Sequence, residues 1–401
     1  MRRYFIIAAI VIVLLGAGVL AYFYFLTNAP GVTVAPSGSA GLPLAGQQGA
    51  PSTNTGTNIP SPSPSAPAAV SARLVQVSTG PVVPGEVVVD TKAQNASSSP
   101  EALVTYIERE SGNVFSFLPS TQALTRINNK TIPGIQSAEW LPDASTAFVR
   151  YLSGADFSTI NTYALSATST DGFFLPQNLS DLSVSSTSIL TLASGVNGSV
   201  ASLQRSDGTH ASEIFTTPLS ALRVSFAGKN QYLAFSKPSG SLWGDAFLVD
   251  AAGRFSRIAG PLKGLVALAS PSGKWVLVSY DQGAQMQMEL VNTSTGALLP
   301  LPVATIADKC VWTADETALY CGIPMSPDTS FLYPDDWYQG ATHFSDRIWK
   351  IDVTGRYAQL VLDFSQAKKG ALDATALAID PLHTTLVFVN KNDGSLWSYS
   401  L

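Results

Sequence analysis

The sequence predicts an all-β fold, a seven-bladed β-propeller, and two observations support this prediction. The first is a recurring hairpin signal: an apolar run, a turn rich in Pro, Asp, Gly, Ser or Lys, and a second apolar run. The second is the spacing of these hairpins, about 40–45 residues, which matches the length of a propeller blade. Copies of the signal lie at residues 138–152, 222–236, 266–280, 309–321 and 376–390.

The overall composition excludes one large class of partner. The chain has 401 residues, of which 13% are charged, and its formal net charge is −5. Soluble domains typically carry about 25% charged residues, so neutral segments must account for the shortfall. An acidic chain without a basic patch lacks the electrostatic footprint of a nucleic-acid-binding protein, so no nucleic-acid partner is expected.

The first of the neutral segments is a predicted membrane anchor. Residues 4–26 contain no charge and are rich in Ile, Val, Leu, Ala and aromatic residues, and about 20 such residues span a bilayer. Arg2 and Arg3 precede them, so the positive-inside rule keeps the N-terminus in the cytoplasm and exports the rest. We therefore expect residues 1–26 to form a cytoplasmic stub and a single-pass anchor in the inner membrane. A cleaved signal peptide is the alternative.

A second neutral segment separates this anchor from the predicted propeller. Residues 27–71 contain no charged residue and are rich in Pro, Ser, Gly and Thr. Such a composition buries too little apolar surface to fold, so we expect a disordered linker that holds the domain away from the membrane.

The remaining residues, 72–401, divide into successive groups of predicted strands. Strands are expected at 254–258 and 265–269, among others, and the last group is one strand short. We expect residues 73–77 to complete that group beside 395–400, because an open ring would expose strand edges. Six or eight blades remain alternatives, and a β-sandwich is a further one. The predicted blades cover residues 82–127, 135–177, 182–216, 222–258, 265–300, 309–362 and 375–400.

The two cysteines of the chain, Cys310 and Cys321, lie in one predicted hairpin. A symmetric turn places them opposite each other, and paired residues of antiparallel strands lie about 4.5–5.5 Å apart, within reach of a disulfide. We expect a disulfide because the predicted topology puts the domain in an oxidising compartment. Two small buried thiols are the alternative.

Several hairpin phrases carry a resemblance to a known family. The phrases SPSGKWVLV, WTADETALY and WLPDASTAFV resemble the WD40-like repeats of the TolB-type propeller family. The Trp-Asp dipeptides of intracellular WD40 blades are absent from the sequence. The resemblance implies recognition or scaffolding in the bacterial cell envelope, in the periplasm or on the cell surface, and implies no particular ligand.

A long connection, residues 322–345, interrupts the sixth predicted blade, and connections of this length in compact folds are usually functional or disordered. Its richness in aromatic residues argues against disorder. Two compatible interpretations are a self-packed cap over the channel and a binding loop that offers acids to a cation and rings for stacking. The candidate binding residues are Phe331, Tyr333, Asp335, Asp336, Trp337 and Tyr338.

The sequence contains no recognisable catalytic constellation. His210, His343 and His383 are far apart, no Gly-x-Ser-x-Gly elbow occurs, and we expect neither a metal nor a cofactor. The hypothesis from sequence is therefore a membrane-tethered, extracytoplasmic propeller that binds an envelope protein or a glycan without catalysis. The alternatives are a propeller enzyme that acts on a glycan at the channel mouth, and a purely structural spacer of the envelope.

Overall fold

The structure, a computed structural model, describes residues 73–91, 100–283, 285–366 and 370–401. All of these residues belong to one compact unit. The predicted anchor at residues 4–26 and the predicted linker at residues 27–71 lie outside the described residues. Among the described residues, no helix is both long and apolar enough to cross a membrane.

The described chain is almost entirely antiparallel sheet, in five four-stranded sheets and one seven-stranded sheet. Three of the four-stranded sheets, in chain order, contain β2 (Val87–Asp90), β3 (Ala102–Ile107), β4 (Val114–Leu118) and β5 (Ala123–Asn128); β6 (Ile135–Trp140), β7 (Thr146–Ser153), β8 (Thr159–Ser166) and β9 (Gly172–Phe174); and β10 (Leu179–Val184), β11 (Ser188–Gly195), β12 (Gly198–Arg205) and β13 (Ser212–Thr217).

The other sheets follow in chain order, with two short helices. The seven-stranded sheet contains β14 (Leu222–Phe226), β15 (Gln231–Ser236), β16 (Trp243–Asp250), β17 (Phe255–Ala269), β18 (Trp275–Asp281), β19 (Met286–Asn292) and β20 (Leu298–Pro300). Then come η1 (Ala307–Lys309), β21 (Cys310–Trp312), β22 (Ala318–Pro324), α2 (Asp335–Tyr338), β23 (Asp346–Asp352) and β24 (Tyr357–Asp363). The last sheet contains β25 (Ala374–Ile379), β26 (Thr385–Asn390), β27 (Leu396–Ser400) and β1 (Leu74–Gln76).

The five recurrent hairpins share one turn geometry. Each turns through a residue in the left-handed region of backbone space, with φ between 58° and 76°. This conformation suits glycine, but four of the five turns place a residue with a side chain there. Each such residue costs roughly 1 kcal/mol or more, and the pairing of the two strands must offset this cost. The residues are Ala144, Asn230, Gly273, Glu316 and His383.

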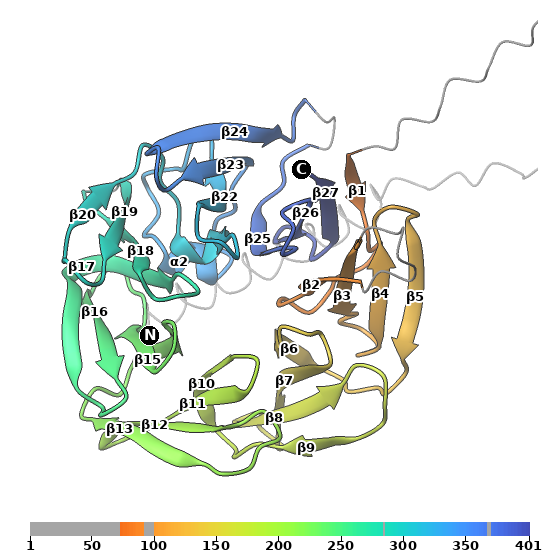
Figure 1. Cartoon of the computed structure of the whole chain (residues 1–401), viewed down its shortest axis with the longest axis horizontal. Coiled ribbons are helices and arrows are strands. Elements are labelled where there is room, and N and C mark those ends of the chain that lie inside the picture. The colour runs from red at the N-terminus through yellow and green to blue at the C-terminus, as the bar shows by residue number, and fades with distance from the viewer. Residues whose placement is uncertain (1–72, 92–99, 284, 367–369) are drawn as a thin grey trace, which may run out of the picture. The chain divides into compact units, whose positions relative to one another are not determined.

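The sheets form a ring (Figure 1). Apolar cores lie between neighbouring sheets. One core joins Val104 and Phe117 of the first sheet to Val387 and Leu396 of the last. Another joins residues of β7 to residues of β11. Radial sheets that bury both faces against their neighbours, around a central channel, are the architecture of a β-propeller. The prediction of an all-β, propeller-like fold is therefore confirmed.

The first and last described strands lie side by side. β1 pairs with β27 in antiparallel register, Leu74 opposite Tyr399 and Gln76 opposite Trp397. Arg73 adds a hydrogen bond of 3.0 Å from its Nε to the carbonyl of Ser400. This pairing makes β1 the outer strand of the sheet that contains β25, β26 and β27.

The hairpin of β21 and β22 carries a covalent link between its strands. Cys310 and Cys321 are directly opposite in the register, and a disulfide joins them. β22 is buried along its whole length, so this link lies in the apolar interior.

Candidate functional site

The long connection between β22 and β23 folds into a compact cap that contains α2. A hydrogen bond of 3.0 Å from the Met325 amide to the Ser345 carbonyl holds its two ends together. The helix begins directly after Pro334, and its first turn carries Asp335 and Asp336, a favourable combination because proline fits a helix start and acids complement the helix dipole.

Most aromatic side chains of this cap turn inward. Tyr333, Trp337 and Phe344 are buried, and the Trp337 and Phe344 rings stack with centroids 6.1 Å apart. Phe331 is half-buried and Tyr338 is 39% exposed. The packing of the first three rings corresponds to the self-packed cap, one of the two interpretations of the sequence, and leaves Tyr338 available to a ligand.

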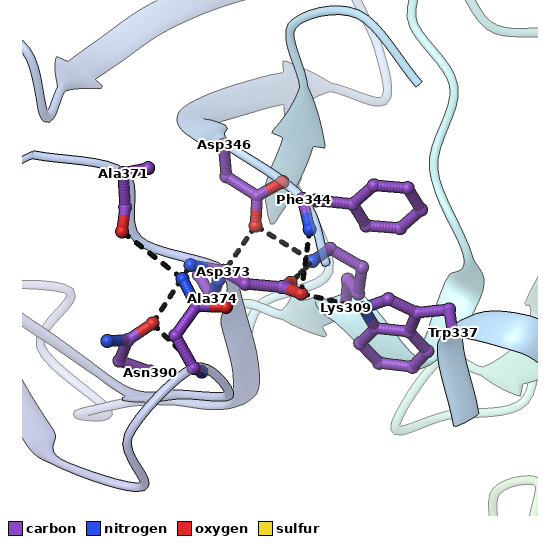
Figure 2. A network of polar contacts seen from close by, with 9 residues as sticks. Lys309, Trp337, Phe344, Asp346, Ala371, Asp373, Ala374 and Asn390 are labelled. Atoms are coloured by element: carbon purple, nitrogen blue, oxygen red, sulfur yellow. Dashed lines mark hydrogen bonds and ion pairs between the residues drawn. The ribbon is translucent and has the colours of Figure 1, made fainter. Parts of the chain in front are cut away.

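A buried charge network fastens the cap to the two sheets beside it (Figure 2). The Lys309 ammonium lies 2.8 Å from Asp346 Oδ2 and also pairs with the Asp373 carboxylate. Asp373 Oδ2 accepts hydrogen bonds from Trp337 Nε1 at 2.9 Å and from the Phe344 amide at 3.0 Å. One cation thus faces two carboxylates away from water, and burial raises the pKa of Asp346 to about 6 although Lys309 opposes this effect.

The two acids of α2 bind backbone groups. Asp335 accepts a hydrogen bond from the Gly240 amide, which ties the cap to the loop after β15. Asp336 accepts one of 2.6 Å from the Leu332 amide, just before the helix. Both carboxylates thereby fix the conformation of the cap, and neither lines the cavity described next.

Below α2 lies a cavity of about 260 Å³ in the ring. Its walls come from the start of the described chain, from the cap, and from the last sheet. Trp337 and Tyr338 are the candidate residues from sequence that line it, whereas Phe331 and Tyr333 do not. The lining residues are Val82, Pro84, Arg109, Asp308, Trp337, Tyr338, Thr375, Val389, Lys391 and Gly394.

A charged cluster crosses the ring next to this cavity. Asp308 Oδ2 accepts hydrogen bonds from the Tyr338 hydroxyl at 2.6 Å and from Arg223, on β14, at 2.7 Å. Arg223 in turn lies close enough to Asp181 of β10 and Glu139 of β6 to affect their pKa values. These residues come from three separate sheets and from η1, so the cluster links several sheets of the ring.

The cluster contains one group that can exchange a proton near neutral pH. Glu139 is accessible to water yet enclosed by protein, and this loss of bulk solvent raises its pKa to about 7, with a further contribution from Asp181. Part of the Tyr338 ring is exposed, but its hydroxyl group is enclosed by protein, and this enclosure raises its pKa, so the hydroxyl stays protonated and donates to Asp308. The channel thus offers donors, acceptors and a ring face to a polar ligand.

Several residues of this site escaped the sequence analysis. Lys309 looked like the polar start of a hairpin, and its partners Asp346 and Asp373 lie 37 and 64 residues further along the chain. Arg109 and Lys391 belong to loops whose meeting depends on ring closure. No local pattern could have signalled these contacts. Within the described residues, no group of three or more His, Cys, Asp or Glu side chains is placed to hold a metal ion.

Comparisons with known proteins support the fold. No family model and no curated protein sequence matches the chain. Its structure is similar to an oligogalacturonate lyase from Vibrio parahaemolyticus, with a TM-score of 0.54 and 10% identity over 82% of this chain and 93% of that one. A second oligogalacturonate lyase, in complex with manganese, gives 0.51 and 10% identity over 80% and 98%. The chain is a β-propeller. TolB from Acinetobacter baumannii is also similar, with a TM-score of 0.44, 10% identity and coverage of 79% and 80%.

Proposed function

We propose that this propeller is a membrane-tethered module that binds a protein segment or a glycan at its channel mouth, outside the cytoplasm and without catalysis. The observation that carries this proposal is the cavity of about 260 Å³ beneath α2. Its lining combines the exposed Tyr338 ring, the cations Arg109 and Lys391, and the acceptor Asp308. A concave site with a few converging polar groups on largely apolar walls is the usual form of a ligand pocket.

Binding by the full-length chain, purified in detergent, tests this proposal. Immobilised protein is exposed to libraries of glycans and peptides, and the affinity for each ligand found is then measured. We expect Tyr338→Ala to weaken binding about tenfold, because a ring contact and a donor to Asp308 are lost together. Tyr357→Ala is the matched control, since Tyr357 is exposed on β24 and does not line the cavity.

The same preparation separates the alternatives. Release of products from the glycan library would contradict the proposal and favour an enzyme. Glu139 can exchange a proton near neutral pH, so Glu139→Gln would then be the first variant to test for loss of turnover. A purely structural spacer would bind no ligand in either library. Ligands that bind the Tyr338→Ala variant as tightly as the parent chain would place recognition elsewhere on the protein.

The tether is part of the proposal and rests on the sequence. Residues 4–26 would anchor the chain in the inner membrane, and residues 27–71 would hold the propeller on the outer side. Protease added to spheroplasts should digest a tag placed after Leu401 while a cytoplasmic marker survives. Protection of the tag until the membrane is broken would contradict this orientation.

We also propose a count of seven blades and a relation to the TolB-type propellers. The seven-stranded sheet can be divided at β17, whose first part pairs with β16 and whose last part pairs with β18. With the five four-stranded sheets, this division gives seven units. The hairpin phrases at residues 140–149, 270–278 and 312–320 are the support for the family relation.

A further inference from the structure

The cavity beneath α2 has an excess of positive charge. Its charged lining residues are Arg109, Asp308 and Lys391. Asp308 is already engaged by Arg223 and by the Tyr338 hydroxyl. Among the described residues, neither Arg109 nor Lys391 forms an ion pair within 4 Å: the Arg109 guanidinium donates to the neutral Gln136 side chain at 3.1 Å, and Lys391 lies over the Trp337 ring at 5.1 Å.

The environment of Lys391 disfavours its own charge. Its side chain is half-buried, and this loss of solvent lowers the pKa of its ammonium group, as does the neighbouring Lys309 ammonium. The Asp373 carboxylate acts in the opposite direction, but it is already shared by Lys309, Trp337 and the Phe344 amide. An anion in the cavity would supply the counter-charge that Lys391 lacks, because an ion removed from water is stabilised by an opposite charge nearby.

The size and walls of the cavity suit a small anionic group on a ring-sized ligand. A volume of about 260 Å³ lies below the range of about 300–1,000 Å³ that drug-sized ligands occupy. Pro84 and the exposed Tyr338 ring offer apolar surfaces to the face of a ring, while Asp308 can accept hydrogen bonds from hydroxyl groups. Arg109 can bind a carboxylate through two parallel hydrogen bonds.

We infer that this cavity binds a uronic acid residue, a sugar whose carboxylate lies between Arg109 and Lys391 and whose ring packs on Tyr338. The inference rests on the proposed binding function and adds to it the class of ligand. The carboxylate meets the two unpaired cations, the carbon face of the sugar meets apolar walls, and the sugar hydroxyls meet Asp308. A peptide with a free C-terminal carboxylate meets the first condition equally well, so the experiment below includes one.

Binding of glucuronate and glucose to the full-length chain in detergent tests this inference, by ligand-observed nuclear magnetic resonance or calorimetry. We expect glucuronate to bind at least about tenfold more tightly than glucose, because a hydrogen bond to a charged group contributes about 1.5–3 kcal/mol. Arg109→Gln and Lys391→Met should each weaken glucuronate binding about tenfold, and added salt should weaken it further. Arg205→Gln and Lys229→Met, two exposed cations away from the cavity, should leave the affinity unchanged.

Three results would overturn the inference in different ways. If glucose binds as tightly as glucuronate and Tyr338→Ala weakens the binding of both, the proposed binding function is supported and the inferred preference for a uronic acid is wrong. If a short peptide with a free C-terminal carboxylate binds more tightly than glucuronate, and its amidated form does not, the cavity binds the C-terminus of a peptide and the inference is wrong. If no library ligand binds in a manner that depends on Tyr338, both the proposed function and this inference are wrong.

Discussion

At the scale of single residues, the carboxyl group of Glu86 is buried and has a strongly raised pKa. Burial raises its pKa from an ordinary value of 4.5 to about 8, against the lowering effect of the Glu86 and Gly85 amides. Glu86 is therefore a neutral acid at pH 7. Between pH 4.5 and 8 the folded chain holds this proton while the unfolded chain releases it, so the contribution of Glu86 to stability falls as pH rises through this window.

The Glu86→Gln substitution should remove this pH dependence. The amide cannot ionise, so we expect the variant to be more stable than the parent chain at pH 9, by on the order of a few kcal/mol, and nearly equal to it at pH 5. Urea unfolding at the two pH values measures both differences. Glu110→Gln, at an exposed position, serves as control and should change neither. A parent chain and Glu86→Gln variant with parallel pH profiles would show that Glu86 ionises normally.

Lys309 offers a second prediction at this scale. Lys309→Met leaves Asp346 and Asp373 buried without their cation, and breaking a buried pair in this way costs about 3–5 kcal/mol. The triple variant Lys309→Met, Asp346→Asn, Asp373→Asn removes all three charges, so we expect it to be more stable than the single variant. Thermal unfolding compares the two. Equal stability would mean that the cap is held mainly by its aromatic packing and that the ion pairs add little.

At the scale of elements, the hairpin of β21 and β22 shows what local pattern can and cannot predict. Its two strands and turn were readable from apolar runs around a polar turn, and the positions of the cysteines followed from the symmetry of that turn. Lys309, expected as the first residue of the strand, lies in η1 and is fully buried. Its burial depends on carboxylates from β23 and the approach to β25, which no local pattern includes.

The disulfide of this hairpin gives a prediction at the same scale. The variant Cys310→Ala, Cys321→Ala loses a link across 11 positions of sequence, and such a link stabilises a fold by about 2–4 kcal/mol. We expect a correspondingly lower urea midpoint. Reductant should bring the parent chain down to the midpoint of the variant and leave the variant unchanged. A reductant effect on the variant would have to come from another cause, because the chain has no further cysteine.

β17 is a second element that the local sequence pattern does not predict correctly. Two strands were expected, at residues 254–258 and 265–269, because Gly and Pro between them usually interrupt a strand. The structure has one strand, Phe255–Ala269, since Leu262 and Lys263 find partners on β16, and Lys263 also pairs with β18. Long-range pairing thus overrides a local interruption, which explains why the ladder runs through seven strands.

At the scale of the whole molecule, the pairing of β1 with β27 should determine stability. A chain without residues 73–78 loses a strand and leaves an open edge, so we expect a lower melting temperature and self-association. A synthetic peptide of residues 73–78 should restore the parent melting temperature by adding to the exposed edge. The same peptide with proline in place of Val75 should fail, because proline removes an amide from the centre of the strand. Unchanged melting after the deletion would refute a stabilising role for this contact.

The fold and the site were predictable to different degrees. Hairpin spacing predicts the propeller-like fold because each repeat is a local unit that recurs along the chain, as the hairpins at residues 266–280 and 309–321 do. The site depends on side chains that meet only after the ring forms, such as Arg109, Asp308 and Lys391. Sequence could place Trp337 and Tyr338 near the channel because both lie on one unusual connection.

The contact between Arg73 and Ser400 spans 327 residues, and it sets the order of events during synthesis. While a ribosome is still making the chain, β1 has no partner until residues 396–400 have been translated. The ring therefore cannot close until β27 has been made, and the edge that β1 leaves unpaired stays exposed during that interval. A nascent form of this protein should depend on chaperones until β27 is available to pair with β1.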